Sequence, residues 1–137
     1  MEQALKFGIQ CVTSREAENG DAVMFDIDDT LIRSIDGTQI KEMIQLFHIC
    51  QSRGYIMVVI TARPHTLENV KHTHEQLLIN GITQDRLIFA EASYKTKAKE
   101  VTGLHYVLSV GDLYTDLGGS DHYIKLPDWN DKNVYTR

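Results

Sequence analysis

The chain has 137 residues, of which 42% are hydrophobic and 24% are charged, and its formal net charge is −5. This length suits a single domain with a self-sufficient core. The acidic balance argues against general binding to nucleic acid or to an acidic membrane, although it is compatible with a local phosphate pocket. We expect one domain over residues 1–137, with a helical extension over 1–20, a core over 21–130 and small partners.

The first residues lack the basic start and the unbroken apolar run of a secretory signal, and no later stretch has the character of a membrane span. Cys11 and Cys50 are isolated and fit no close-spaced metal pattern. They are more typical of small packed hydrophobes than of a disulfide bond. We therefore expect an intracellular, reducing location, the cytoplasm.

In chain order, Leu5, Ile9 and Val12 have helical spacing and predict a leading helix that ends near Asn19–Gly20. Apolar runs over 22–27 and 55–60 are typical of strands covered on both faces. Apolar stripes within 40–47 and 67–77 predict two helices, closed by Gly54 and Gly81. Further patterns predict strands near 87–90, 105–110 and 123–126, with a helix near 95–101.

This alternation of strands and helices predicts an α/β fold. Right-handed crossovers between parallel strands give a three-layer, Rossmann-like sandwich with a central parallel sheet of about five strands. In such folds the ligand site lies outside the carboxyl ends of the strands. Residues that follow the strands are therefore the candidates for function.

Acidic residues stand where the first strand ends, in the stretch Phe25-Asp26-Ile27-Asp28-Asp29-Thr30-Leu31. Asp26 and Asp28 are two apart and should emerge on the same side of the chain. Paired carboxylates either raise the pKa of one member or require a cation, and both outcomes suit chemistry on a charged substrate. An ordinary acidic turn is the structural alternative.

Three further groups are expected at the same edge. Thr61-Ala62-Arg63 follows the second strand, Lys95 opens a helix, and an acidic loop from Gly111-Asp112 to Asp116 follows the fourth strand. For Asp112 and Asp116 the structural alternative is a helix cap and a solvated acid in the first turn. The combination is far more specific than any single member.

This ordered set resembles the haloacid dehalogenase superfamily of phosphotransferases. More closely, Ile60-Thr61-Ala62-Arg63-Pro64, Tyr94-Lys95, Gly111-Asp112 through Asp116-Leu117-Gly118 and Ile124-Lys125-Leu126-Pro127 look like the subfamily III (class B) acid phosphatases related to plant vegetative storage proteins. The likeness spans about residues 20–130. Most of that subfamily is longer, but neither 31–39 nor 61–95 leaves room for a large cap domain here, so we expect a capless fold with a small flap around 34–37.

The resemblance implies a role for each carboxylate. Asp26 is the expected nucleophile and Asp28 the general acid and base. Mg²⁺ is the expected cofactor, with Asp26 and Asp112 as direct ligands. Asp28 contributes its backbone carbonyl, and Asp116 binds the metal or its waters.

Thr61 is expected to donate its hydroxyl to a phosphate oxygen, and Lys95 to supply positive charge to Asp26 and the phosphoryl group. Lys97 and Lys99 compete for the second role, but Tyr94-Lys95 matches the subfamily, which makes the other two candidate surface charges. Three roles are open for Arg63: it binds substrate phosphate through two N–H groups, stabilises the Thr61 loop, or lies on the surface. Asp29 stands at a position where the resembling family often has glycine. It is a candidate partner for Arg63 or Lys95.

The expected activity is magnesium-dependent hydrolysis of phosphomonoesters through an aspartyl-phosphate intermediate. An open site suits a small phosphomonoester, a nucleotide or a phosphorylated chain end. A polynucleotide-end phosphatase is one alternative, which would need a basic track. A non-catalytic binding or storage protein is the other. Tyr114 and Trp129 are candidates to stack on a base, although lone aromatics at loop ends are more often hydrophobic plugs.

Overall fold

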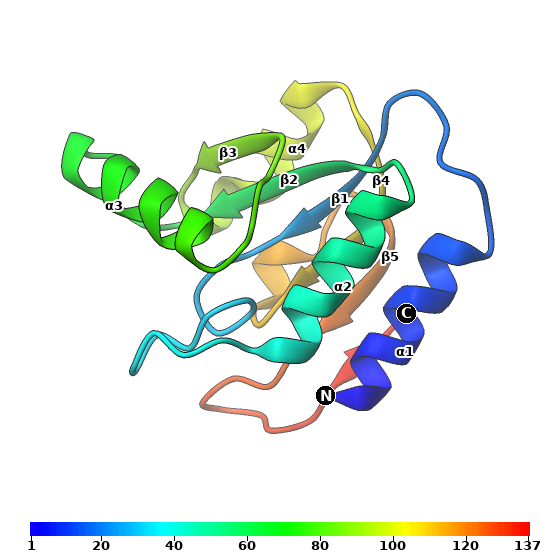
Figure 1. The fold of residues 1–137 in the computed structure, drawn as a ribbon, viewed down its shortest axis with the longest axis horizontal. Helices are drawn as coiled ribbons and strands as arrows, with labels where there is room; N and C mark the ends of the chain where they lie inside the picture. The colour runs from blue at the N-terminus through cyan, green and yellow to red at the C-terminus, as the bar shows by residue number, and fades with distance from the viewer.

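The computed structural model describes the whole chain, residues 1–137. Its elements, in order, are α1 (Glu2–Thr13), β1 (Asp21–Phe25), α2 (Lys41–Ser52), β2 (Ile56–Thr61), α3 (Leu67–Ile79), β3 (Arg86–Phe89), α4 (Lys95–Thr102), β4 (His105–Gly111), β5 (Ser120–Lys125) and β6 (Tyr135–Thr136). Short 3-10 helices, η1 (Ala92–Tyr94) and η2 (Tyr114–Asp116), precede α4 and follow β4. The predicted α/β fold is confirmed (Figure 1).

The strands form one six-stranded sheet in the order β3-β2-β1-β4-β5-β6. Every neighbouring pair is parallel except β5 and β6. The chain runs outward from β1 to β3 and then returns to place β4 beside the other edge of β1. In open parallel sheets, ligands bind where the strand order reverses in this way. The carboxyl ends of β1 and β4 are therefore the expected place for a site.

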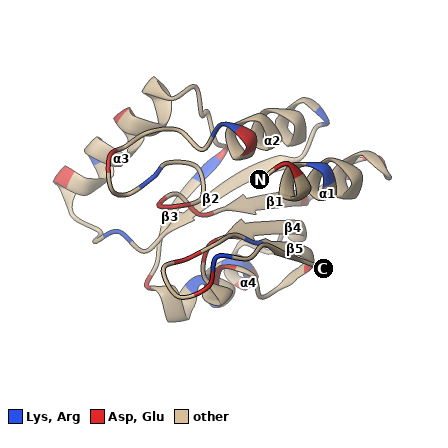
Figure 2. Ribbon diagram, turned by 90° about the horizontal axis from the view of Figure 1, so that it is seen from below, with Lys and Arg blue, Asp and Glu red and all other residues tan.

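Helices cover both faces of the sheet. Figure 2 shows α1, α2 and α3 on one side and α4 on the other. Val23 and Phe25 of β1 join the larger core, with residues of α1 and α2, whereas Ala22 and Met24 join a smaller core that packs against Ala98 of α4. Because both faces are covered, every residue of β1 is buried, which explains its continuous apolar run.

The leading helix is shorter than its sequence pattern predicts. It ends at Thr13 rather than near Asn19–Gly20. The hydroxyl of Thr13 donates to the carbonyl of Ile9 at 2.7 Å, and the hydroxyl of Ser14 donates to the carbonyl of Cys11 at 3.3 Å. The carbonyl of Cys11 is one of those left without a backbone partner at the helix end, so the Ser14 hydroxyl caps the helix there.

One strand has no counterpart in the sequence patterns. β6 pairs antiparallel with the end of β5, through Ile124 opposite Thr136 and Lys125 opposite Tyr135. A segment of two residues carries no periodicity, so only the register of the folded chain defines it.

No large cap domain is present at the carboxyl ends of the strands. The longest connection there, after β1, contains a loop closed by an antiparallel bridge between Ile32 and Gln39. We call residues 32–39 the flap. Cys11 and Cys50 are both buried and free. None of the helices has the length and apolar character required to cross a bilayer.

Candidate active site

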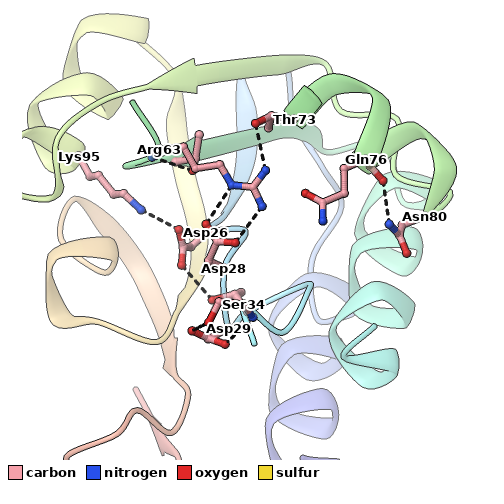
Figure 3. Close-up of polar contacts among 11 residues, drawn as sticks. Asp26, Asp28, Asp29, Ser34, Arg63, Thr73, Gln76, Asn80 and Lys95 are labelled. Carbon is pink, nitrogen blue, oxygen red and sulfur yellow. Dashed lines mark hydrogen bonds and ion pairs between the residues drawn. The ribbon is translucent and has the colours of Figure 1, made fainter. Parts of the chain in front are cut away.

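An acidic cleft of about 320 Å³ opens at the carboxyl ends of β1, β2 and β4. Thr61 and Asp116 do not line this cleft, but both are buried and both contact residues that do. The fold therefore brings every predicted site residue to one place. Figure 3 shows four of them, Asp26, Asp28, Arg63 and Lys95. The lining residues are Asp26, Asp28, Asp29, Ala62, Arg63, Ala92, Lys95, Asp112 and Leu113.

Asp26 is held in place from two sides. Its side chain is nearly buried, and one carboxylate oxygen accepts a hydrogen bond of 2.7 Å from the Lys95 ammonium. The other oxygen accepts from the hydroxyl of Thr30 at 3.2 Å. The loop that carries Thr30 is closed by the carbonyl of Ile27, which accepts from three successive backbone N–H groups. The Asp26 carboxylate is thus fixed in orientation before any ligand binds.

Lys95 is the lysine of the cleft. Its ammonium lies 2.7 Å from a carboxylate oxygen of Asp26 and 2.7 Å from one of Asp116. Burial lowers the pKa of Lys95, but the charges of Asp26 and Asp116 outweigh burial, and the pKa is raised overall. Lys95 therefore stays charged and links the two acidic loops.

The other two lysines of α4 differ from each other. Lys97 is exposed and pairs with Glu100 at 3.6 Å, as a surface charge would. The interpretation of Lys99 as a surface charge is wrong, because Lys99 is fully buried. It donates to the hydroxyl of Ser109 at 2.9 Å and to the carbonyl of Asp116 at 2.6 Å. Burial lowers the pKa of Lys99 to about 8.

The acidic loop after β4 packs tightly on itself. Asp116 accepts from Lys95 with one oxygen and from the backbone N–H of Leu113, at 3.1 Å, with the other. Its side chain passes so close to Gly111 that a Cβ at that position would collide with it. The absence of a side chain at Gly111 is therefore what allows Asp116 to reach Lys95.

Two carboxylates of the cleft have raised pKa values. Burial raises the pKa of Asp26 well above its ordinary value, and the Asp116 carboxylate adds to this effect, while Lys95 opposes it. Burial also raises the pKa of Asp112, despite a hydrogen bond with Asp26 that lowers it. Ionised oxygens would coexist here more easily with a divalent cation among them.

The donor set fits such a cation. Asp26, Asp112 and Asp116 each offer an oxygen, and these oxygens lie within 4.8 Å of one another. Asp26 and Asp112 line the cleft, whereas Asp116 is buried behind them with both oxygens already bonded. The first two are therefore the residues that would hold Mg²⁺, with Asp116 positioning Asp26 through Lys95. The Asp28 carboxylate is not a member of this group.

Asp28 is paired with Arg63. The guanidinium donates to both carboxylate oxygens of Asp28, from Nε at 3.0 Å and from Nη2 at 2.8 Å. Its third nitrogen donates to the hydroxyl of Thr73, a buried residue of α3, at 3.0 Å. This bidentate pair explains why Arg63 is not a free surface arginine (Figure 3).

Thr61 ends β2 and is buried. Its hydroxyl oxygen accepts the backbone N–H of Arg63 at 3.2 Å, which bends the chain away from the strand. The hydroxyl proton takes no part in that bond and remains free to donate. Its role toward a phosphate oxygen stays a prediction.

Asp29 does not pair with Arg63 or Lys95. Its carboxylate instead accepts from the backbone N–H and the hydroxyl of Ser34, at 2.9 and 2.8 Å, and so fastens the flap to the cleft. Its φ of 61° lies in the left-handed region, which Asp tolerates better than most residues.

No protein-family model matches the chain, and no curated protein does.

Three contacts of the site escape sequence reasoning. Two of them are the hydrogen bond from Thr30 to Asp26 and the ion pair of Asp28 with Arg63. No sequence motif or spacing predicts that these residues meet. Lys99 had one available signal, since it lies one helical turn after Lys95 and therefore on the same face of α4. Its burial was unexpected because lysine is rarely buried without several partners.

Proposed function

We propose that the chain hydrolyses phosphomonoesters, with Asp26 as the nucleophile. The observation that carries this proposal is the buried Asp26 carboxylate, oriented by Lys95 and Thr30 and open to the same cleft as Asp28 and Asp112. A carboxylate with this support is suited to attack phosphorus, and the flanking positive charge stabilises the transferring phosphoryl group.

The reaction has two steps. A carboxylate oxygen of Asp26 attacks phosphorus while the ester P–O bond breaks, and Asp28 gives its proton to the departing alkoxide. Water then attacks the phosphorus of the aspartyl-phosphate, transfers a proton to Asp28, and releases inorganic phosphate with Asp26 restored. Asp28 thus regains in the second step the proton that it gave in the first.

Arg63 governs when Asp28 is available. While both Asp28 oxygens accept from the guanidinium, neither is free to deliver a proton. A phosphate dianion entering the cleft offers Arg63 a second bidentate partner. Exchange of Arg63 toward the phosphate then frees an oxygen of Asp28, which takes up a proton from water and can pass it to the leaving group.

Mg²⁺ held by Asp26 and Asp112 would neutralise charge on the phosphate and on the carboxylates. Lys95 supplies a further positive charge at Asp26, where it also contacts Asp116. Thr61 donates its free hydroxyl proton to a phosphate oxygen.

The surface gives little support to a polynucleotide-end phosphatase. In Figure 2, Lys and Arg are scattered over several elements, with Asp and Glu among them. A storage or binding protein remains the alternative of a different class. It predicts phosphate binding without turnover, which the experiment below separates from hydrolysis.

The test is hydrolysis of para-nitrophenyl phosphate with Mg²⁺ and with a chelator, in the wild type and in Asp26→Asn. We expect turnover that requires Mg²⁺ and falls by about 10³-fold or more in Asp26→Asn. Glu100→Gln, the same acid-to-amide change on the exposed face of α4, is the control and should keep normal turnover. Near-normal turnover in folded Asp26→Asn would overturn the assignment of the nucleophile.

A further inference from the structure

Helix α3 meets the acidic cleft through a buried hydroxyl group. Only two residues of this helix, Thr73 and Leu77, are buried. The hydroxyl of Thr73 accepts a hydrogen bond of 3.0 Å from Nη1 of Arg63, which lines the cleft. An apolar side chain is the usual choice at a buried position of a helix that covers a sheet. The hydroxyl of Thr73 therefore has a purpose other than packing.

The Arg63 guanidinium has donors to spare. Arginine carries five N–H groups. In Arg63, Nε and Nη2 each donate to Asp28 and Nη1 donates to Thr73, which leaves two N–H groups without an acceptor. The side chain is only 17% exposed, so an acceptor from the protein would stabilise these groups.

The same face of α3 offers such an acceptor. Gln76 follows Thr73 by about one helical turn, which makes the two side chains neighbours on the helix surface. Oε1 of Gln76 is buried and has no hydrogen-bond donor. Figure 3 shows its carboxamide extending from α3 on the side where Thr73 meets Arg63. A buried acceptor without a donor costs free energy, which a shift of Arg63 toward it would recover.

We propose that Thr73 and Gln76 are positioning residues for Arg63. This inference rests on the proposed function, in which Arg63 exchanges Asp28 for the phosphate of the substrate. Thr73 holds Nη1 as a fixed point while Nε and Nη2 turn to the phosphate, and Oε1 of Gln76 accepts a free N–H group in the new orientation. Gln76 is then satisfied only when substrate is bound, so α3 favours the state in which Asp28 is released.

The fixed point reduces the cost of binding. An arginine side chain is long and flexible, and a guanidinium without an anchor would have to be ordered when the phosphate arrives. The bond to Thr73 orders Arg63 in advance and limits its motion to a turn about Nη1. Phosphate therefore meets a guanidinium that already lies at the correct depth in the cleft.

Thr73 can be tested by separating its hydroxyl from its methyl group. Thr73→Val keeps the volume and removes the acceptor, whereas Thr73→Ser keeps the acceptor and removes the methyl group. We expect Thr73→Val to raise the KM for para-nitrophenyl phosphate about tenfold, and Thr73→Ser to keep it within about twofold despite a lower Tm. Thr102→Val, the same change at the far end of α4, is the control. Losses that follow Tm, with Thr73→Ser the worse variant, would overturn the inference.

Gln76 allows a sharper test, because its effects on stability and on activity should have opposite signs. Gln76→Met removes the buried oxygen and keeps the length, so Tm should rise by about 2–4 °C. The KM for para-nitrophenyl phosphate should nevertheless rise about threefold to tenfold. Gln84→Met is the matched control, since its Oε1 is also buried without a donor but precedes β3, at the amino end of the strand. It should raise Tm without changing KM, and the same result in Gln76→Met would overturn the role of Gln76.

Phosphate binding separates this inference from the proposed function. The Nε–H group of Arg63 gives an NMR signal that can be identified by its loss in Arg63→Lys. Inorganic phosphate with Mg²⁺ should shift this signal in the wild type, and Thr73→Val should need about tenfold more phosphate for the same shift. If both results appear without turnover, the phosphatase fails and the positioning role stands. No shift of the wild-type signal would overturn the positioning role, whatever the turnover.

Discussion

Asp28 illustrates how one pairing determines the chemistry of a residue. Its carboxylate is 38% exposed, yet both oxygens accept from Arg63 in the unliganded cleft. In the proposed mechanism, an oxygen of Asp28 must instead face the leaving group. Under that proposal, exchange of Arg63 toward a phosphate dianion frees this oxygen, so proton transfer depends on bound substrate.

Replacement of Asp28 by Asn removes the proton donor and keeps the shape. We expect Asp28→Asn to slow hydrolysis of an alkyl phosphate by about 10²- to 10⁴-fold, the usual contribution of general acid catalysis. Para-nitrophenolate leaves without a proton, so para-nitrophenyl phosphate should lose much less. The measurement is kcat for both substrates, with thermal unfolding to show that the variant is folded. Equal losses for the two leaving groups would argue against the assigned role.

At the scale of elements, the loop from β4 to η2 depends on one missing side chain. Gly111 has no positive φ that would require glycine, so its conformation is open to alanine. A methyl group there would nonetheless collide with the Asp116 side chain. Displacing Asp116 would loosen its bonds to Lys95 and to Leu113, and with them the support of Asp26.

Gly111→Ala should therefore affect stability and activity together. Overpacking of this kind costs about 1–3 kcal/mol of unfolding free energy, and a displacement near 1 Å at the site costs about 10²-fold in kcat. Thermal unfolding and kcat for para-nitrophenyl phosphate measure the two effects. A variant with wild-type Tm and kcat would show that the loop accommodates the methyl group and that Asp116 is not held by this contact.

The elements differ in how far sequence predicts them. β1 and β2 are buried on both faces, so continuous apolar runs such as Met57–Ile60 mark them clearly. Helix ends depend on local hydrogen bonds from hydroxyl groups, as at the end of α1. A strand as short as β6 is defined only by its pairing with β5. Site residues at strand ends follow from topology. The contacts of Thr30 and Arg63 depend instead on loop conformation, which no spacing encodes.

At the scale of the whole molecule, the candidate site and an ion network lie at opposite ends of the strands. The cleft lies at the carboxyl ends of the strands, whereas an ion network lies at their amino ends, where Asp21 begins β1 and His105 begins β4. His105 contacts Asp21 at 2.8 Å and Asp121 at 2.7 Å, and Arg15 contacts Asp21 at 2.6 Å. The network thus ties the end of α1 to β1, β4 and β5, which are neighbours in the sheet.

This network should make stability depend on pH without changing the chemistry. The hydrogen bond to Asp21 is the main reason that the pKa of His105 is raised, with Asp121 contributing. A raised pKa means that the folded state holds the proton more tightly, so the stabilisation is complete below the unfolded value of about 6.5 and is lost as pH rises through the folded pKa. His105 is half-exposed, so screening by solvent and salt keeps the effect modest.

His105→Gln keeps a polar side chain at this position but cannot take up the proton. Denaturant unfolding of both proteins between about pH 5.5 and 9 should show the wild type ahead by a margin that shrinks as pH rises, because only the protonated imidazole gains from Asp21 and Asp121. High salt should narrow the margin at low pH. Turnover of para-nitrophenyl phosphate should match the wild type, since the network lies at the far edge of the sheet. A margin independent of pH would show that His105 contributes through packing or neutral hydrogen bonds. A loss of kcat would show that the two edges are coupled through β1 and β4.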